Sequence, residues 1–193
     1  MGWIKEVGMD ISCNTDRLHL RNLQAIHADK VLEFYIRNKD HFEPYEPDRD
    51  PNFYNIHFQK LTLSMEQSLM MQNKLFRLWF FKKNNFNTII GSVNFYNLTY
   101  GPYCTCQIGY KLDQAYTKKG YAYEGIKKGM ELFIEQHPKI HRIEANIMPS
   151  NLSSIKLIEK LGFEYEGLAK KNIRINFNWE DHYRYAYLTK NYE

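Results

Sequence analysis

Apolar side chains recur three or four positions apart in four segments of the chain, and this spacing predicts helices that bury one face. The four segments are residues 25–37, 53–74, 121–136 and 151–161. Asn151 is a good N-cap for the last helix, because its side chain can accept a hydrogen bond from a free backbone N–H. Gly162 follows that helix, at the position where a left-handed residue commonly ends one.

Seven further segments are apolar on alternate positions or along their length, and are bounded by polar turns, which predicts strands. They are residues 17–21, 75–82, 88–98, 104–112, 142–148, 164–175 and 179–189. Residues 41–51 contain three prolines and cannot be regular helix, so we predict an ordered loop or a mobile flap there. The pattern as a whole predicts an α/β (α+β) fold with about seven strands and about four helices.

One part of this order has a defined handedness. Strand 104–112, helix 121–136 and strand 142–148 form a β-α-β unit. Such crossovers are right-handed, and open α/β sheets bind ligands at the carboxyl ends of their strands. We therefore look for a ligand site in the loop that follows residue 112.

The composition agrees with one well-packed domain that spans residues 1–193. Hydrophobic residues make up 44% of the chain and aromatic residues 16%. The net charge of +4 is too small to indicate nucleic-acid binding by itself, and it fits a polyanionic cofactor or an acidic partner equally well.

The cysteines and the chain start indicate a compartment. Cys13, Cys104 and Cys106 lack the spacing of a metal knuckle or a redox motif, so we expect buried, reduced thiols. No apolar segment is long enough to span a bilayer, and Met1–Gly8 has no signal-peptide core. These features predict a cytoplasmic protein with no membrane partner.

The loop before the third predicted helix has the features of an anion site. Residues 117–125 read Thr-Lys-Lys-Gly-Tyr-Ala-Tyr-Glu-Gly and lead from a strand into a helix. The first N–H groups of a helix have no internal partner, and the helix dipole adds positive charge there, so phosphate binds well. Gly120 permits close backbone approach, while Lys118 and Lys119 add charge. The sequence therefore predicts a ligand that carries phosphate groups.

Six blocks of the sequence together carry a family resemblance. They are Gly109-Tyr110, Lys119–Glu124, His141–Asn146, Pro149–Ser154, Lys160–Gly167 and Trp179–His182. With them the chain resembles the GNAT superfamily of acetyltransferases, and most of all the RimJ/RimL-type (ribosomal-protein-alanine) N-terminal acetyltransferases. The resemblance extends from Arg17 to about Leu188, which we take as the core of the domain. It implies a mixed, mostly antiparallel, twisted sheet that is splayed between its fourth and fifth strands.

The resemblance also implies acetyl-CoA as the cosubstrate, with its pantetheine arm in the splay. The family's pyrophosphate signature, Gln/Arg-x-x-Gly-x-Gly/Ala, here reads Thr117–Ala122, so the first position departs from it. Asn151 and Ser154 match the family residues beside the pantetheine arm and the cofactor sulfur. The expected cofactor-binding residues are Ile108, Gly109, Tyr110, Thr117, Lys118, Lys119, Gly120, Tyr121, Ala122, Asn151 and Ser154.

Three residues are candidates for the chemistry. Many relatives place a glutamate base on the fourth strand, where this chain has Gln107. Glu46 in the proline-rich loop is then the first carboxylate candidate, and Asp181 the second. The alternative for Glu46 is an exposed loop glutamate, and for Asp181 an ion pair or a turn cap. Ser154 is the candidate for hydrogen bonding or protonating the leaving thiolate. A backbone N–H between Ile108 and Tyr110 is the expected oxyanion donor.

The acceptor stays open between classes. An α-amine has a pKa of about 7.7–8.0 and lysine about 10.4, so an N-terminal acceptor needs little help from a base. A protein N-terminus, with transient ribosomal contact, is the favoured acceptor. A small amine such as a polyamine, amino acid or antibiotic is the alternative, as is a non-catalytic acyl-CoA-binding module. We expect no metal site, since His141 and His182 lack metal-ligand spacing, and either a monomer or a homodimer.

Overall fold

The computed structural model describes residues 10–189. The segment Met1–Gly8, for which we expect no signal peptide, lies outside the described residues. The helices and strands, in chain order, are β1 (Ser12–Asn14), β2 (Leu18–Arg21), η1 (Ala25–His27), α1 (Ala28–Arg37), α2 (Lys39–Phe42), η2 (Glu43–Tyr45), α3 (Ile56–Met71), β3 (Phe76–Lys82), β4 (Asn85–Thr99), β5 (Thr105–Leu112), η3 (Gln114–Tyr116), α4 (Tyr121–Gln136), β6 (Arg142–Ile147), α5 (Leu152–Lys160), β7 (Glu164–Ile175) and β8 (Asn178–Leu188).

Within the described residues, eight strands form one sheet in the order β1-β2-β3-β4-β5-β6-β8-β7. The β5–β6 pair is parallel and the other pairs are antiparallel. This confirms the mixed, mostly antiparallel α/β sheet and the predicted β-α-β unit around α4.

Two elements exceed the predicted counts of about seven strands and four helices. The additional strand is β1, which pairs with β2 and has three residues, too few to show an alternation. The additional helix is α2, which extends two residues into residues 41–51, so the prediction of no regular helix was wrong for His41 and Phe42. Pro44 then occupies the first turn of η2, where the missing N–H of proline costs nothing.

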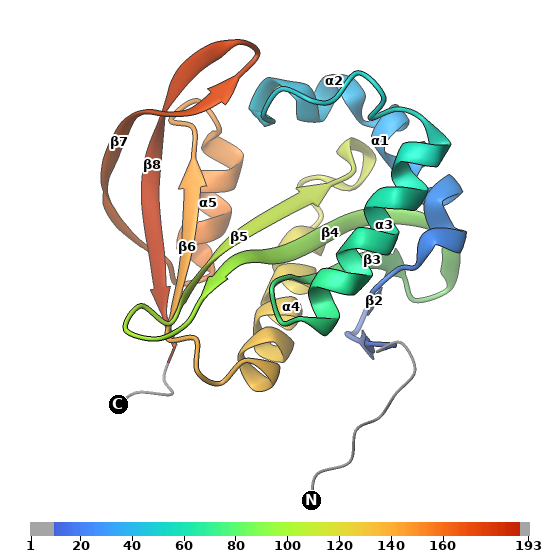
Figure 1. Ribbon diagram of the computed structural model, residues 1–193, viewed down its shortest axis with the longest axis horizontal. Coiled ribbons are helices and arrows are strands. Elements are labelled where there is room, and N and C mark those ends of the chain that lie inside the picture. The colour runs from blue at the N-terminus through green and yellow to red at the C-terminus, as the bar shows by residue number, and fades with distance from the viewer. Residues whose placement is uncertain (1–9, 190–193) are drawn as a thin grey trace, which may run out of the picture.

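Helices cover both faces of the sheet (Figure 1). α1 and α3 lie on one face, and α4 and α5 on the other. β3 shows the division, because Leu78 and Phe80 join the core beneath α4 while Trp79 and Phe81 join the core beneath α1 and α3. No helix among residues 10–189 is long and apolar enough to cross a membrane.

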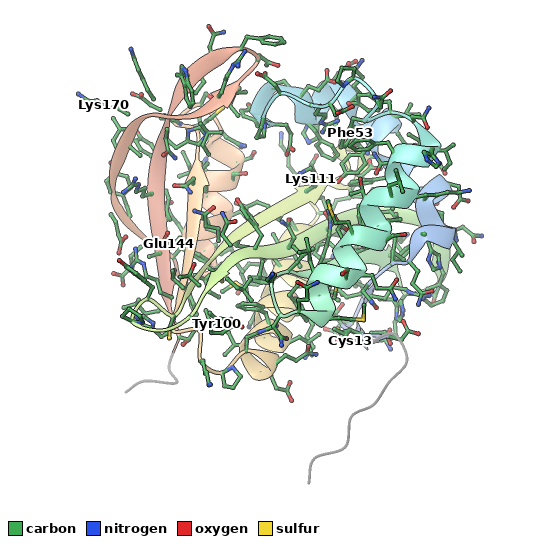
Figure 2. The ribbon with its side chains drawn as sticks, viewed as in Figure 1. Cys13, Phe53, Tyr100, Lys111, Glu144 and Lys170 are labelled. Carbon is green, nitrogen blue, oxygen red and sulfur yellow. The ribbon has the colours of Figure 1, made fainter. Side chains whose placement is uncertain are left out.

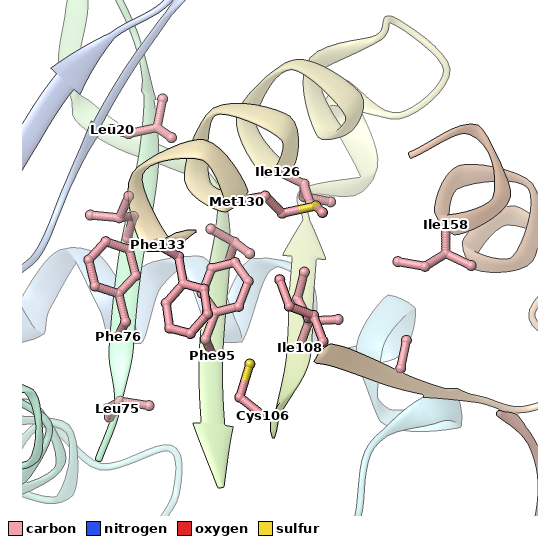
Figure 3. Packing of buried hydrophobic residues seen from close by; sticks show 14 of the residues in the cluster. Leu20, Leu75, Phe76, Phe95, Cys106, Ile108, Ile126, Met130, Phe133 and Ile158 are labelled. Carbon is pink, nitrogen blue, oxygen red and sulfur yellow. The ribbon is translucent and has the colours of Figure 1, made fainter. Parts of the chain in front are cut away.

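The core beneath α4 fixes where that helix begins. The ring of Phe133 stacks on Phe95 of β4 with centroids 4.1 Å apart, and Ile126 and Met130 lie on the same helix face (Figure 3). Gly129 lets the helix approach the sheet, since a Cβ there would lie 2.6 Å from a methyl carbon of Val93. α4 is therefore held close to the sheet, with its N-terminus just after the end of β5.

The cysteines agree with expectation only in part. Cys106 on β5 is buried, and burial raises the pKa of its thiol. Cys104 and Cys13 are only partly buried, so the prediction of buried thiols was wrong for these two. Cys104 precedes β5 with a φ of 43°, where its thiol donates to the carbonyl of Gly101 at 3.0 Å.

Candidate functional site

β5 and β6 separate partway along their length. They pair only where Thr105–Gln107 lies beside Arg142–Glu144, whereas β4 continues to pair with the other edge of β5 as far as Leu112. Beyond Gln107, the edge of β5 that faces β6 thus has backbone groups with no strand partner. Such groups need hydrogen-bonding partners, and an extended ligand with amide groups can supply them. We call this opening the fork.

Side chains alternate between the two sides of the fork. Ile108 and Tyr110 point toward α4 and α5, and both belong to or contact the core there. Gly109 and Lys111 point to the opposite, open side. A Cβ on Gly109 would lie 3.0 Å from the side-chain oxygen of Asn94, so glycine keeps this side of the strand free of atoms next to the fork.

The N-terminus of α5 closes the far side of the fork. Asn151 is its N-cap, as predicted, and its side-chain oxygen accepts from the N–H of Ser154 at 3.1 Å. The hydroxyl of Tyr110 donates to the carbonyl of Ser154 at 3.3 Å, across the fork. Burial raises the pKa of Tyr110 to about 12, and contact with Ser154 only partly opposes this. The structure thus brings three of the expected cofactor-binding residues together.

The predicted phosphate loop leads from η3 into α4 with an unusual backbone. Lys118 has a φ of 57° and Gly120, the N-cap of α4, has a φ of 81°. Left-handed residues that alternate with other backbone conformations in this way turn neighbouring N–H groups toward one point, which forms an anion-binding concavity. The first N–H groups of α4, from Tyr121 and Ala122, follow directly. This geometry suits a pyrophosphate.

Two side chains of the loop turn back onto the protein. The Thr117 hydroxyl donates to the carbonyl of Gln114 at 2.9 Å, and the Lys119 ammonium donates to the carbonyl of Ala115 at 2.7 Å. Both bonds stabilise the loop itself. Lys118, whose side chain is exposed, is the lysine with the freedom to reach an anion.

Arg17 also contacts this loop, although the sequence analysis did not identify it as a site residue. Its guanidinium donates to the carbonyl of Lys119 at 2.9 Å and to Glu124 at 2.6 Å, and lies over the ring of Tyr121. Burial acts to raise the pKa of Glu124, but hydrogen bonds from Thr15 and Arg17 outweigh it and the pKa is lowered. Arg17 stands about a hundred residues before the loop, so no local pattern could have joined them.

Glu46 lies beside the open side of β5. Its carboxylate pairs with the Lys111 ammonium at 2.7 Å, and both side chains are mostly buried. Burial raises the pKa of the Tyr96 hydroxyl, and the negative charge of Glu46 raises it further, so the two groups are near each other. The predicted candidate therefore faces the site and is not an exposed loop glutamate.

The segment that holds Glu46 continues to the β7–β8 hairpin. Pro47 forms a β-bridge with Ile175 at the edge of β7. Asp48 pairs with Arg174 at 3.1 Å and accepts from the N–H of Phe177 at 2.9 Å. We call residues 43–48 the strap, because they join the open side of β5 to the sheet edge. The proline-rich segment is thus an ordered structure with defined contacts.

Asp181 has a different position. Its carboxylate accepts from the N–H of Lys171 at 2.8 Å, in the irregular part of the β7–β8 hairpin. By alternation along β8 it shares the side of Tyr183 and Tyr185, opposite to the open side of the fork. The structure does not bring Asp181 to the site, and the hairpin bond matches the alternative role of a turn cap.

Glu144 on β6 is the carboxylate that sequence reasoning overlooked. It lies directly opposite Gln107, the last paired residue before the fork, and points to the open side (Figure 2). Gln107 is itself held, since its side-chain oxygen accepts from Asn97 at 3.2 Å. The alternation of Ile143, Glu144 and Ala145 already indicated which side Glu144 faces. What it did not indicate is which strand would lie beside β6.

A polar cavity of about 230 Å³ opens at this point. It is lined by Gln107, Arg142, Glu144, Ala145, Asn146, Glu166, Asn172, Arg184 and Tyr185. Three side-chain amides and four charged groups thus surround a space next to the fork. Among residues 10–189 no group of three or more His, Cys, Asp or Glu is arranged to hold a metal ion.

Known proteins with similar sequences and structures agree with this geometry. Residues 17–164 match the family model described as an acetyltransferase (GNAT) domain. The chain is 32% identical over 172 residues to the [ribosomal protein uS5]-alanine N-acetyltransferase of Escherichia coli (strain K12), covering 89% of this chain and 88% of that protein.

Solved structures share the fold. The ribosomal-protein-S5-alanine acetyltransferase from Vibrio fischeri superimposes with a TM-score of 0.89 at 30% identity, over 95% of this chain and 100% of that one. RimJ of Mycobacterium smegmatis, solved in complex with CoA-disulfide, has a TM-score of 0.82 at 22% identity, over 91% of this chain and 83% of that one. By its sequence, its fold and its fork, this chain belongs to the GNAT family of acetyltransferases.

Proposed function

We propose that this chain transfers an acetyl group from acetyl-CoA to the α-amine of a protein N-terminus, by direct attack within a ternary complex. The observation that carries the proposal is the fork together with the phosphate loop, which follows the carboxyl end of β5. An extended ligand that has amides at one end and a pyrophosphate at the other fits both parts at once.

The residues present fit acetyl-CoA, which supplies the acetyl group as a thioester. The loop Thr117–Ala122 would hold the pyrophosphate with N–H groups and Lys118. The free edge of β5 from Ile108 to Tyr110 would bond the pantetheine amides and offer an N–H to the developing oxyanion. A preorganised donor of this kind contributes about 2.7–4 kcal/mol to such reactions.

On the other side of the fork, α5 would complete the site. Asn151 uses its side-chain oxygen as a helix cap, which leaves its NH₂ group to donate to a pantetheine carbonyl. Ser154, one turn on, is the candidate for donating a hydrogen bond to the leaving thiolate.

Two carboxylates on the open side could receive the proton that the amine loses. Glu46 is joined to Lys111, and Glu144 lies at the start of the fork, opposite Gln107. We favour Glu144, acting directly or through a water, because the strands separate beside it. A general base is assigned first by whether its side chain can reach the reacting amine, and only then by its pKa.

The charges around the site favour a peptide over a polycation. Glu46 is neutralised by Lys111, and Arg142 is bonded to both Glu144 and Glu166. A polyamine needs carboxylates that are free to bind its ammonium groups. The amides of Gln107, Asn146 and Asn172, which both donate and accept, instead match the main chain of a peptide.

A ribosomal protein with an N-terminal alanine is the specific acceptor we propose, from the activity named for the E. coli relative. Such an acceptor places the reaction in the cytoplasm and requires transient contact with a ribosomal protein. The whole chain would then serve as one acetyltransferase domain.

The test has two parts. Titration with acetyl-CoA should raise the melting temperature, since ligand at a hundredfold excess over Kd stabilises by about 2.7 kcal/mol. Release of CoA is then measured with alanine- and serine-starting peptides, polyamines and amino acids. We expect turnover with the peptides. Turnover with the small amines alone would show that the acceptor is a small molecule and not a peptide. Tight binding of acetyl-CoA without turnover would indicate a non-catalytic acyl-CoA-binding module.

A further inference from the structure

The polar cavity beside the fork holds, besides Glu144, three charged side chains that the transfer reaction itself does not require. Arg142 is central among these charged groups: Nε donates to Glu144 at 2.7 Å, and the two terminal nitrogens donate to the two oxygens of Glu166. This bidentate contact joins β6 to β7, although β8 lies between them in the sheet. The three side chains are therefore held in fixed positions along one wall.

Arg184 on β8 adds a second positive charge to the cavity. Arg184 lies opposite Asn146 on the neighbouring strand β6, and both side chains face the same open side as Glu144. The hydrogen bond from Arg142 lowers the pKa of Glu166, and the charge of Arg184 lowers it further. Two arginines and two glutamates thus line one cavity, and their formal charges cancel.

The position of the cavity determines what can enter it. Gln107 and Glu144 line both the cavity and the start of the fork. An acceptor whose amine reaches the fork from the open side therefore has space to place the residue after its first one over the cavity. A volume of about 230 Å³ holds several waters or one side chain of moderate size.

We propose that this cavity is the subsite for the second residue of the acceptor, and that it selects an uncharged, hydrogen-bonding side chain. This assignment rests on the proposed peptide acceptor. Side-chain amides of Asn146 and Asn172 supply donors and acceptors for such a residue. A charged side chain gains no net attraction there, yet it loses its water, so it is disfavoured whichever sign it carries.

Charge balance predicts how the preference can be changed. Removal of Glu166 leaves a net charge of +1, and removal of Arg184 leaves −1. Glu166 and Arg184 are both exposed at the rim of the cavity, so one unpaired charge there should change relative kcat/KM by about threefold at low salt. The two variants should therefore move the preference in opposite directions, which a general loss of structure cannot do.

The experiment compares Glu166→Gln and Arg184→Gln with the wild type on three peptides that differ only at residue 2, as Ala-Ser, Ala-Glu and Ala-Lys. The wild type should prefer Ala-Ser. Glu166→Gln should favour Ala-Glu over Ala-Lys by about threefold at low salt, and Arg184→Gln the reverse. Matched controls are Glu164→Gln and Lys170→Gln, since both residues are exposed on β7 and outside the cavity.

Each outcome decides the matter. Opposite shifts in the two variants, with the controls unchanged, support the subsite. If the wild type is active but neither variant changes its preference, the subsite is wrong while the proposed function stands. Equal loss on all three peptides, with normal thermal unfolding, shows a general role in catalysis and also overturns the subsite. A wild type that acetylates no peptide overturns the peptide acceptor itself.

Discussion

The carboxylate of Asp113 accepts a hydrogen bond from Nε of Arg37 at 2.8 Å, which joins the end of α1 to the turn before the phosphate loop. Asp113 is 2% exposed and also caps η3 by accepting from the N–H of Ala115. Asn38, the residue that follows α1, is equally buried, and its side-chain oxygen accepts a hydrogen bond from the N–H of Gln114 at 2.9 Å. Two of these bonds therefore reach the start of the loop from the end of a helix on the opposite face of the sheet, and the third holds the turn itself.

This junction predicts that Asp113→Asn weakens cofactor binding. Loss of the charge leaves Arg37 without its buried partner and lets the turn move, so KM for acetyl-CoA should rise about tenfold while KM for the peptide changes little. Steady-state kinetics with each substrate varied in turn checks this split.

Glu66→Gln is the matched control for Asp113→Asn. Glu66 is also buried and paired with an arginine, Arg77, but it joins α3 to β3 and does not touch the loop. It should lower the melting temperature without a change in KM for acetyl-CoA. A similar rise of that KM in both variants would show that general destabilisation is the cause.

The backbone at Gly120 gives a second prediction. With φ at 81°, any L-residue is strained by roughly 1 kcal/mol, and a Cβ would lie 3.2 Å from a guanidinium nitrogen of Arg17. Gly120→Ala should weaken CoA binding several-fold, and Gly120→Glu much more, because its charge would repel the pyrophosphate. Calorimetric titration with CoA measures both; equal affinity in all three proteins would remove the loop from the cofactor site.

The local parts of this site could be predicted from the sequence, and the assembled parts could not. The loop Thr117–Ala122 and the cap Asn151 follow from short-range rules about helix ends. Glu144 and Arg17 depend on which strands lie side by side, and that is set by packing across the sheet. The strap shows the same limit, since the prolines in residues 41–51 predicted an ordered loop or a mobile flap but did not indicate contact with β7.

The two carboxylates on the open side differ in their expected effects. Glu144→Gln should lower kcat by about 10²–10⁴-fold if this side chain accepts the proton, and a peptide amine with a lower pKa should partly restore the rate. Glu46→Gln, which loses the bond to Lys111, should mainly raise KM for the peptide. The kcat profiles of both variants against pH, on one peptide, provide the comparison. A large loss of kcat in Glu46→Gln with a normal Glu144→Gln would reverse the two assignments.

Tyr110 ties the stability of the fork to alkaline pH. An unfolded tyrosine loses its proton near pH 10, whereas burial raises the pKa of Tyr110 to about 12. Between these values the unfolded chain binds fewer protons than the folded one, so stability falls as pH rises. This contribution is fully present below pH 10 and is lost by about pH 12, at most about 2.7 kcal/mol.

Tyr110→Phe removes this titrating group while it keeps the ring beside α5. The variant should be slightly less stable than the wild type at pH 8, because the bond to Ser154 is lost. Its stability should then fall less steeply from pH 9 to 11, although Tyr54 and Tyr185, whose pKa values are also raised to about 12, keep part of the slope. Urea unfolding at each pH measures the two curves. Parallel curves would mean that the Tyr110 hydroxyl ionises as it does in water, and that the fork is open to solvent at this residue.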